Sequence, residues 1–430
     1  MLQKFRRAAV ARHAERLRQP HSRASLSIGM ALLLGATALA CPAEGARAQL
    51  SLREAETFAL KRNPDLVIAR QRADSAVAEL GIARAFPNPV VQTTPGLPSQ
   101  YGLTVPIDVG PQRHYRVRSQ QIGLSAAGHD TSDTRRQVLF SVRQAYCDAQ
   151  LSTALLGIAR EQRSIVRDLL LADSVRLRSG AIALRDVVKS RVELTRADAV
   201  VARAEADVRS KRVALQLVIG IANPDTGLVI SDTAQSTSLW VPPDSVAERS
   251  ASYRPDFLSA TDRVDARRSD VGYARSLLVP TPNLGVINQP YQPFISGSHY
   301  ALAVGFGVPL FNWFGSERSR AGASLQIAEI TRARQVVQIH AELVETLDSV
   351  RTTRSLVGRY ETGALALSDS ALAMARYAYS GGATSLVDVY DALRTDSAVR
   401  AEYATALHDY RLSVFALRRA AGVEPEGLGQ

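Results

Sequence analysis

The chain has 430 residues and a formal net charge of +11. Its basic and acidic residues alternate along long stretches, as on solvated helix faces, which argues against a nucleic-acid-binding protein. The sequence contains no His-x-x-x-His, Cys-x-x-Cys, Gly-x-Ser-x-Gly or glycine-rich phosphate motif. We therefore predict no metal centre, no cofactor and no enzymatic activity.

The first 48 residues have the composition of a secretory signal peptide. Seven basic residues between Lys4 and Arg23 precede an apolar stretch from Leu26 to Ala40. Ala46-Arg47-Ala48 then forms a small-x-small cleavage site. We predict an exported protein whose mature chain begins at Gln49.

The two cysteines bear on processing and on disulfides. After cleavage at Ala48 only Cys147 remains, so the mature chain can form no intrachain disulfide. A lipoprotein-type site at Ala38-Leu39-Ala40-Cys41 is an alternative, and Cys41 would then be acylated. We favour cleavage after Ala48, because such lipoprotein sites usually have Leu where this chain has Ala38.

Proline placement divides the rest of the chain into two helical windows. No proline lies within residues 112–223 or 310–424, whereas prolines are frequent before each window. Apolar residues recur at intervals of three and four, as on a packed helix face. Each window has a single strong break, at Ser179-Gly180 and at Gly381-Gly382, and glycine ends a helix at little cost. Each window therefore predicts a hairpin of two long antiparallel helices.

A pair of short strands is predicted before each hairpin. In the second pair, large apolar residues alternate with small ones from Tyr300 to Gly307, which suits a strand with one face toward lipid. Val308-Pro309-Leu310 leads into the second hairpin as Val105-Pro106-Ile107 leads into the first. Pro95-Gly96-Leu97-Pro98 interrupts the first pair, so its strands are expected to be short.

The two windows are copies of one another. A shift of 202 positions aligns residues 184–220 with 386–422 and gives eleven identities in 37 positions. Asn63-Pro64-Asp65 likewise recurs as Arg254-Pro255-Asp256. We therefore predict an internal duplication. The predicted boundaries are 1–48 for the signal peptide, 49–223 for the first repeat, 224–250 for a linker, 251–424 for the second repeat and 425–430 for a tail.

The order and duplication of these motifs resemble the TolC family of outer-membrane efflux channels. Each copy has the Pro-Asp helix start, the Val-Pro junction and a glycine turn followed by Leu-x-Asp-Val. Residues 83–91 and Leu310-Phe311-Asn312 resemble the heavy-metal branch of that family. The resemblance implies a mainly α fold with a periplasmic α-barrel of duplicated hairpins. It also implies four strands per protomer in a trimeric, twelve-stranded outer-membrane β-barrel. Four strands alone cannot close a barrel, so the protomers would have to combine.

By the same resemblance, the hairpin turns form a gate at the periplasmic end. Tyr379 would bond to Asp186 across the two hairpins, and Asp388 and Asp391 would line the constriction. Thr384 stands where parts of the family have a stabilising arginine, and Lys189 is the first-repeat equivalent of Asp391. An alternative makes Asp186 and Asp388 helix-capping carboxylates and Tyr379 a packed residue at a helix end.

The resemblance implies an outer-membrane exit duct of a tripartite efflux system in a Gram-negative-type bacterium. Its partners would be two further copies of the chain, a periplasmic adaptor, an inner-membrane pump of the RND type and outer-membrane lipid. A type I secretion channel of the same family, a periplasmic coiled-coil adaptor and an exported enzyme are the alternatives. Adaptors lack a duplicated hairpin with strand pairs, and no catalytic constellation supports an enzyme. The cargo is left open between metal ions, organic compounds and secreted polymers.

Overall fold

The computed structural model describes residues 50–95, 100–108, 110–224, 228–230, 253–288 and 300–422. The predicted signal peptide, Cys41, the tail and most of the predicted linker lie outside the described residues.

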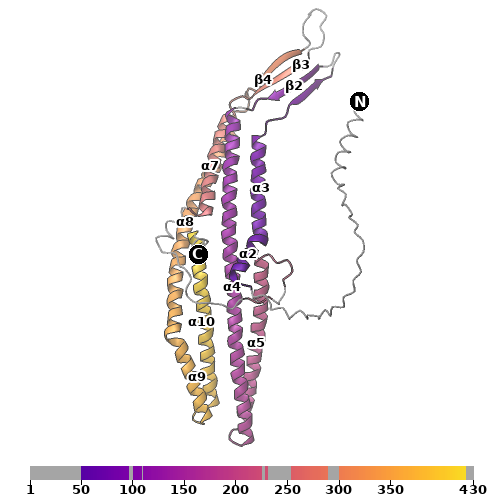
Figure 1. Ribbon diagram of the computed structural model, residues 1–430. Helices are drawn as coiled ribbons and strands as arrows, with labels where there is room; N and C mark the ends of the chain where they lie inside the picture. Colours follow the sequence, from indigo (N-terminus) through magenta and orange to yellow (C-terminus); the bar gives the residue numbers. More distant parts are fainter. Residues whose placement is uncertain are drawn as a thin grey trace, which may run out of the picture. The chain divides into compact units, whose positions relative to one another are not determined.

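Two successive sets of elements build the fold (Figure 1). The first set is α2 (Leu52–Arg62), α3 (Pro64–Arg84), β1 (Val90–Thr94), β2 (Gln100–Pro106), α4 (Pro111–Arg178) and α5 (Leu184–Val218). The second set is α7 (Pro255–Ser276), β3 (Pro282–Asn288), β4 (Tyr300–Phe306), α8 (Gly315–Arg359), the π-helical turn η3 (Tyr360–Ala364), α9 (Leu365–Ser380) and α10 (Leu386–Ala421). The predicted fold class, duplicated helical hairpins with four strands, is confirmed.

Four glycines set the ends of the hairpin helices. Gly180 and Gly382 follow the outgoing arms with φ of +75° and +74°, and Gly220 and Gly422 follow the returning arms with φ of +81° and +67°. Each pair is 202 positions apart, as the sequence repeat requires. Because only glycine enters this left-handed region at little cost, the duplicated sequence places the same stop signals in both copies.

The outgoing arm of the second hairpin differs from the sequence prediction of one break per window. Between α8 and α9 the backbone forms a π turn, in which the Leu365 N–H bonds to the Tyr360 carbonyl. Tyr360 donates its hydroxyl to Glu402, and Tyr403 of α10 donates to Glu361, each at 3.0 Å. In the first repeat, α4 is continuous over 68 residues, or ~100 Å at ~1.5 Å per residue.

The four strands form one antiparallel sheet in the order β1-β2-β3-β4. The register places Leu103 opposite both Val91 and Val286, and it places Val286 opposite Leu302. One face, which we call the apolar face, therefore carries large side chains: Val91, Tyr101, Leu103, Val105, Leu284, Val286, Tyr300, Leu302, Val304 and Phe306. Small and polar residues dominate the opposite face, including Gly102, Thr104, Gly285, Ala301, Ala303 and Gly305. The alternation predicted for residues 300–306 is present.

Helix α4 is central to the packing, since it contacts α3, α5, α7 and α10. Near its middle, Val142 and Tyr146 pack against Ala59 of α2 and Leu215 of α5 in the first core cluster. Leu343 of α8 and Val414 of α10 belong to a second cluster. Each fully buried aliphatic side chain contributes ~1.5–3 kcal/mol. Cys147 of α4 is also buried, and burial raises the pKa of its thiol to about 12.

A buried cluster of charged side chains joins the two repeats. Arg254, whose side chain is 4% exposed, donates to Asp256 at 2.7 Å and to Glu342 at 2.8 Å. Arg136 of α4 lies 3.5 Å from Asp256, and Arg419 of α10 lies 2.8 Å from Glu342. Every carboxylate in this cluster therefore faces a guanidinium, which a buried ion pair requires.

None of the helices within the described ranges combines the length and the apolar composition of a membrane span.

Candidate functional site

The two hairpin turns have the same backbone hydrogen bonding. In the first turn the Ala181 N–H bonds to the Arg176 carbonyl at 2.9 Å, and in the second the Ala383 N–H bonds to the Ala378 carbonyl at 2.8 Å. These bonds satisfy the last carbonyls of α4 and α9. Because α4 is unbroken, its turn lies at the opposite end of the helix from the strands (Figure 1).

Close to the turns, one apolar cluster joins the two hairpins. Val166 of α4 packs with Leu372 of α9 and with Val389 and Leu393 of α10. Tyr379, in the last turn of α9, belongs to the same cluster and is buried. The hairpins are therefore packed against each other near their turns, and polar groups inside this cluster need internal partners.

A buried carboxylate supplies those partners. Asp173 of α4 accepts a hydrogen bond from the Tyr379 hydroxyl at 2.6 Å and one from the Ser190 hydroxyl at 2.5 Å. Tyr390 of α10 donates in turn to Ser190 at 3.0 Å. Both oxygens of Asp173, which is fully buried, are thus satisfied by groups from α5 and α9.

Arg176, one turn beyond Asp173 on α4, makes a second link to the other hairpin. Its guanidinium donates to the Tyr379 carbonyl at 3.2 Å and to the Ser380 carbonyl at 2.9 Å. The guanidinium carbon also lies 4.7 Å from the centre of the Tyr379 ring, a cation–π distance. We call these five residues, Asp173, Arg176, Ser190, Tyr379 and Tyr390, the inter-hairpin latch.

The two phenols of the latch are held in the protonated state. Burial, followed by the hydrogen bond to Asp173, raises the pKa of Tyr379 to about 12. Burial also raises the pKa of Tyr390. Both hydroxyls therefore remain hydrogen-bond donors at neutral pH.

The structure corrects the predicted pairing of Tyr379 with Asp186. Asp186 lies in the first turn of α5, where its nearest cation is Arg185 at 3.6 Å. Within the protomer the Tyr379 hydroxyl bonds to Asp173 instead. The physical reason is burial, since the Tyr379 ring packs with Leu372 and Val389 in the buried cluster, and Asp173 is the acceptor found there.

Asp388 and Asp391 have different surroundings. Asp388 accepts from Thr384 at 2.6 Å and from the Ser385 N–H at 3.0 Å, while Ser385 accepts from the Asp388 N–H, which forms a capping box. The hydrogen bonds from Thr384 and Ser385 lower the pKa of Asp388. Asp391 is 64% exposed, and its nearest cation is Arg394 at 3.5 Å. The capping alternative is thus confirmed for Asp388, whereas Asp391 is exposed to solvent beside Arg394.

Sequence reasoning missed Asp173, Ser190 and Arg176. Their 202-shifted positions are Ala375, Ala392 and Ala378, so the internal repeat carries no signal for them. One signal was available, namely a carboxylate directly after the apolar run Leu169-Leu170-Leu171-Ala172. Such a position on a packed helix demands a buried donor. Among the described residues, no three or more His, Cys, Asp or Glu side chains converge in a way that could hold a metal ion.

The chain is similar to a known protein family and to several characterised proteins. The family described as "Outer membrane efflux protein" matches residues 58–221 and 246–423. The chain is 25% identical to the probable outer membrane lipoprotein SilC of Salmonella typhimurium, over 78% of each protein. It is 24% identical to the cobalt-zinc-cadmium resistance protein CzcC of Cupriavidus metallidurans, over 82% of this chain and 85% of that protein. It is 28% identical to the cation efflux system protein CusC of Escherichia coli K12, over 60% of this chain and 58% of that protein.

Solved structures share the fold. A membrane protein from Pseudomonas aeruginosa superposes with a TM-score of 0.75 at 19% identity, over 86% of this chain and 92% of that one. CusC superposes with a TM-score of 0.72 at 18% identity, over 88% of this chain and 93% of that one.

Proposed function

The chain belongs to the outer membrane efflux protein family, and from this premise we propose that the cargo of its channel is metal cations. The predictions of an outer-membrane efflux channel of the TolC type, of a location that extends into the periplasm and of a protein that is not an enzyme are confirmed by the family match. The match covers the strand pair and the helical hairpin of both repeats.

The names of the relatives carry the proposal for the cargo. CusC is a cation efflux protein and CzcC a cobalt-zinc-cadmium resistance protein, and both are about as distant from this chain as SilC is. The test is to delete the gene in its native host and measure growth inhibition. We expect the tolerated concentration of cobalt, zinc or cadmium to fall, with tolerance of dyes and antibiotics unchanged. Loss of tolerance to the organic compounds alone would assign the cargo to them.

We further propose that the channel is a homotrimer. Strands β1 and β4 form the two edges of the sheet, and among the described residues each pairs with one neighbouring strand only. In lipid an unpaired edge costs several kcal/mol per orphaned group, so three sheets joined edge to edge, in a barrel of twelve strands, relieve that cost. Light scattering of the detergent-purified protein should give three chains per particle. A stable monomer in detergent would contradict the trimer.

We propose that the hairpin turns meet a periplasmic adaptor and an inner-membrane pump of the RND type, and that they form the gate. In this proposal the inter-hairpin latch holds the closed state, because Tyr379 and Arg176 tie the second hairpin to Asp173 and α4 of the first. Opening would separate these groups. Tyr379, Asp388 and Asp391 retain their proposed places near the constriction, and Asp186 stays a proposed gate residue without Tyr379 as its partner.

A further inference from the structure

The connection between β4 and α8, residues 307–314, exposes several large apolar side chains. Val308 is 57% exposed, Leu310 69%, Phe311 99% and Trp313 65%. The matching connection of the first repeat differs, because it contains Asp108, which is buried and ion-paired with Arg116. A strand-to-helix turn in this fold therefore does not need exposed aromatic residues, and those of the second repeat call for a separate explanation.

Hydrogen bonds fix this connection in one conformation. The Asn312 side chain accepts from the Phe314 N–H at 2.9 Å. Arg318 donates to the Trp313 carbonyl at 3.2 Å and to the Phe314 carbonyl at 3.3 Å. Phe314 has a φ of +53°, which costs a non-glycine residue ~1–2 kcal/mol. Phe311 and Trp313 are thus presented outward by a strained and braced backbone.

In sequence, Val308 and Leu310 extend the alternation of large apolar residues that ends at Phe306 on β4. The backbone turns between them, because the Leu310 N–H bonds to the Val308 carbonyl at 2.9 Å. The described strands have five to seven residues, or ~17–23 Å at ~3.3 Å per residue, and tilting shortens their span further. An outward apolar band in the outer membrane is ~25 Å tall. The connection adds apolar surface at the helix-proximal end of the strands, where the described band would otherwise stop.

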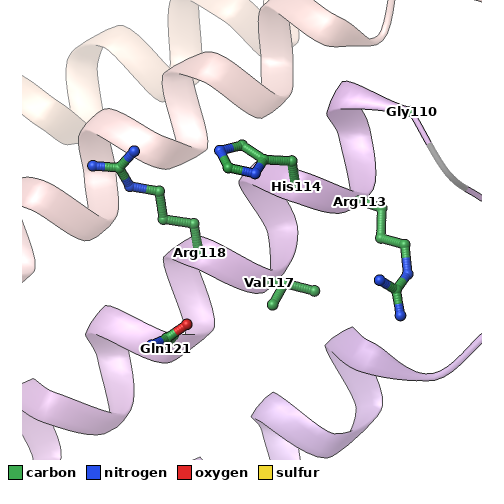
Figure 2. Close-up of a pocket in the computed structure, with 6 residues that line it drawn as sticks. All are labelled: Gly110, Arg113, His114, Val117, Arg118 and Gln121. Carbon is green, nitrogen blue, oxygen red and sulfur yellow. The ribbon is translucent and has the colours of Figure 1, made fainter.

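Basic residues accompany the aromatic ones at this level of the molecule. Arg318 and Arg320 lie in the first two turns of α8 and are exposed. At the connection from α3 to β1, Phe86 is exposed and Arg113 stacks on it at 4.3 Å from the ring centre. Figure 2 shows Arg113 near the start of α4, together with Arg118 one turn further along. Two separate connections therefore combine an exposed aromatic ring with an arginine.

We propose that the β4–α8 connection is an interfacial anchor for a phospholipid surface. Phe311 and Trp313 lie in the periplasm-side leaflet of the outer membrane, and Arg318 and Arg320 contact its phosphate groups. Aromatic rings favour the boundary between acyl chains and headgroups, and arginines near a membrane surface attract anionic lipids. The proposal rests on the proposed function, because it requires the sheet to stand in the outer membrane.

The fluorescence of Trp313 can report its own surroundings, since the chain contains only one other tryptophan, Trp240. The test uses the full-length Trp240→Phe protein in phosphatidylethanolamine–phosphatidylglycerol vesicles with brominated acyl chains. We expect blue-shifted Trp313 emission, strong quenching by the brominated lipid and little quenching by iodide. A matched control carries Leu367→Trp with Trp240→Phe and Trp313→Phe. Leu367 is exposed on α9, far along the chain from the strands, so its reporter should respond to iodide and not to brominated lipid.

Two results would overturn the anchor. Quenching of Trp313 by iodide alone would place it in water. Blue-shifted emission insensitive to both quenchers would place it against protein, between copies of the chain. Conductance of the same Trp240→Phe protein in planar bilayers separates this proposal from the proposed function. A protein that conducts while Trp313 escapes the lipid quencher refutes only the anchor, whereas a protein that inserts in no bilayer refutes the channel.

Discussion

Asn63 and Arg254 hold the same place in the two repeats and bond to equivalent carbonyls. Each directly precedes the proline that begins a helix, α3 or α7. The Asn63 side chain donates to the Val218 carbonyl at 2.8 Å, and Arg254 donates to the Ala420 carbonyl at 2.8 Å. Val218 and Ala420 are 202 positions apart. The same contact therefore occurs in both repeats and joins the start of α3 or α7 to the end of the hairpin of its own repeat.

Arg254→Ala should lower the free energy of unfolding by ~3 kcal/mol, because it removes a buried guanidinium and leaves the partly buried carboxylates of Asp256 and Glu342 with one arginine each. Urea unfolding of the detergent-solubilised protein, followed by circular dichroism, measures this loss. Arg160→Ala is the control, since Arg160 pairs with Glu205 in an exposed position and the change should cost less than ~1 kcal/mol. Equal losses in the two variants would contradict a structural role for the buried cluster.

The same cluster predicts an acid-dependent loss of stability. Burial raises the pKa values of Asp256 and Glu342, but the hydrogen bonds and charge of Arg254 outweigh it, so both pKa values lie below their ordinary values of 3.8 and 4.5. A lowered folded pKa contributes stability above the unfolded pKa, and that contribution disappears as pH falls through the folded pKa. The unfolding free energy should therefore fall below about pH 4.5. The fall should be smaller in Arg254→Ala. A variant with an unchanged acid profile would show that other carboxylates dominate.

Tyr379→Phe should favour the open channel. It keeps the ring and its contact with Arg176 but removes one of the two hydrogen bonds to Asp173, a loss of ~1.5–3 kcal/mol for a charged acceptor. The expected result is a higher mean conductance in planar bilayers. Tyr377→Phe is the control, because Tyr377 is only two residues away and is 82% exposed. If both variants conduct like the parent, the latch does not set the gate.

Asp388 and Asp391 should respond differently to conversion to asparagine. Asp391→Asn removes an exposed charge from each protomer, so cation preference, measured as a reversal potential in a KCl gradient, should weaken. Asp388→Asn disturbs the capping box of α10 and should mainly lower thermal stability. An unchanged reversal potential in Asp391→Asn would remove Asp391 from the constriction.

Three glycines with positive φ form a graded series for Gly→Ala substitution. At Gly180 an added Cβ meets no atom within 4 Å, so only the backbone conformation should cost ~1–2 kcal/mol. At Gly422 the Cβ would lie 3.1 Å from the Arg254 Cγ, and at Gly220 it would lie 2.6 Å from the Arg62 backbone oxygen. The loss of unfolding free energy should rise in the order Gly180, Gly422, Gly220. A Gly220→Ala loss no larger than that of Gly180→Ala would mean that the contact between α2 and α5 relaxes.

The hairpins and strands could be predicted because their signals are local. Glycine at 180 and 382 marks the turns by backbone conformation, and the alternation from Tyr300 to Phe306 marks a two-faced strand. The π turn at 360–364 could not be predicted, since its apolar spacing hardly differs from that of an α-helix. The bulk of the fold thus followed from periodicity and from the duplication.

The candidate site was harder to predict because its contacts are far apart in sequence. Tyr379 and Asp173 are separated by 206 positions, and many carboxylates near the turns could have served as the partner. The resemblance gave Asp186, but the side-chain direction of Tyr379 is decided by packing against Leu372 and Val389. The burial of charged residues such as Arg254 could not be predicted either, because arginine and aspartate occur throughout the chain.

The burial of Cys147 makes the protein convenient for thiol labelling. With its pKa near 12 and its side chain closed off in α4, this thiol has almost no reactive thiolate at the pH of maleimide or spin-label chemistry. Under either processing route predicted for the N-terminus, Cys41 is removed with the leader or blocked by acylation. A single cysteine introduced at a turn or on α9 would then be the sole labelled position. In the proposed homotrimer, distances between the labelled hairpins of neighbouring protomers could then be followed spectroscopically without first removing Cys147.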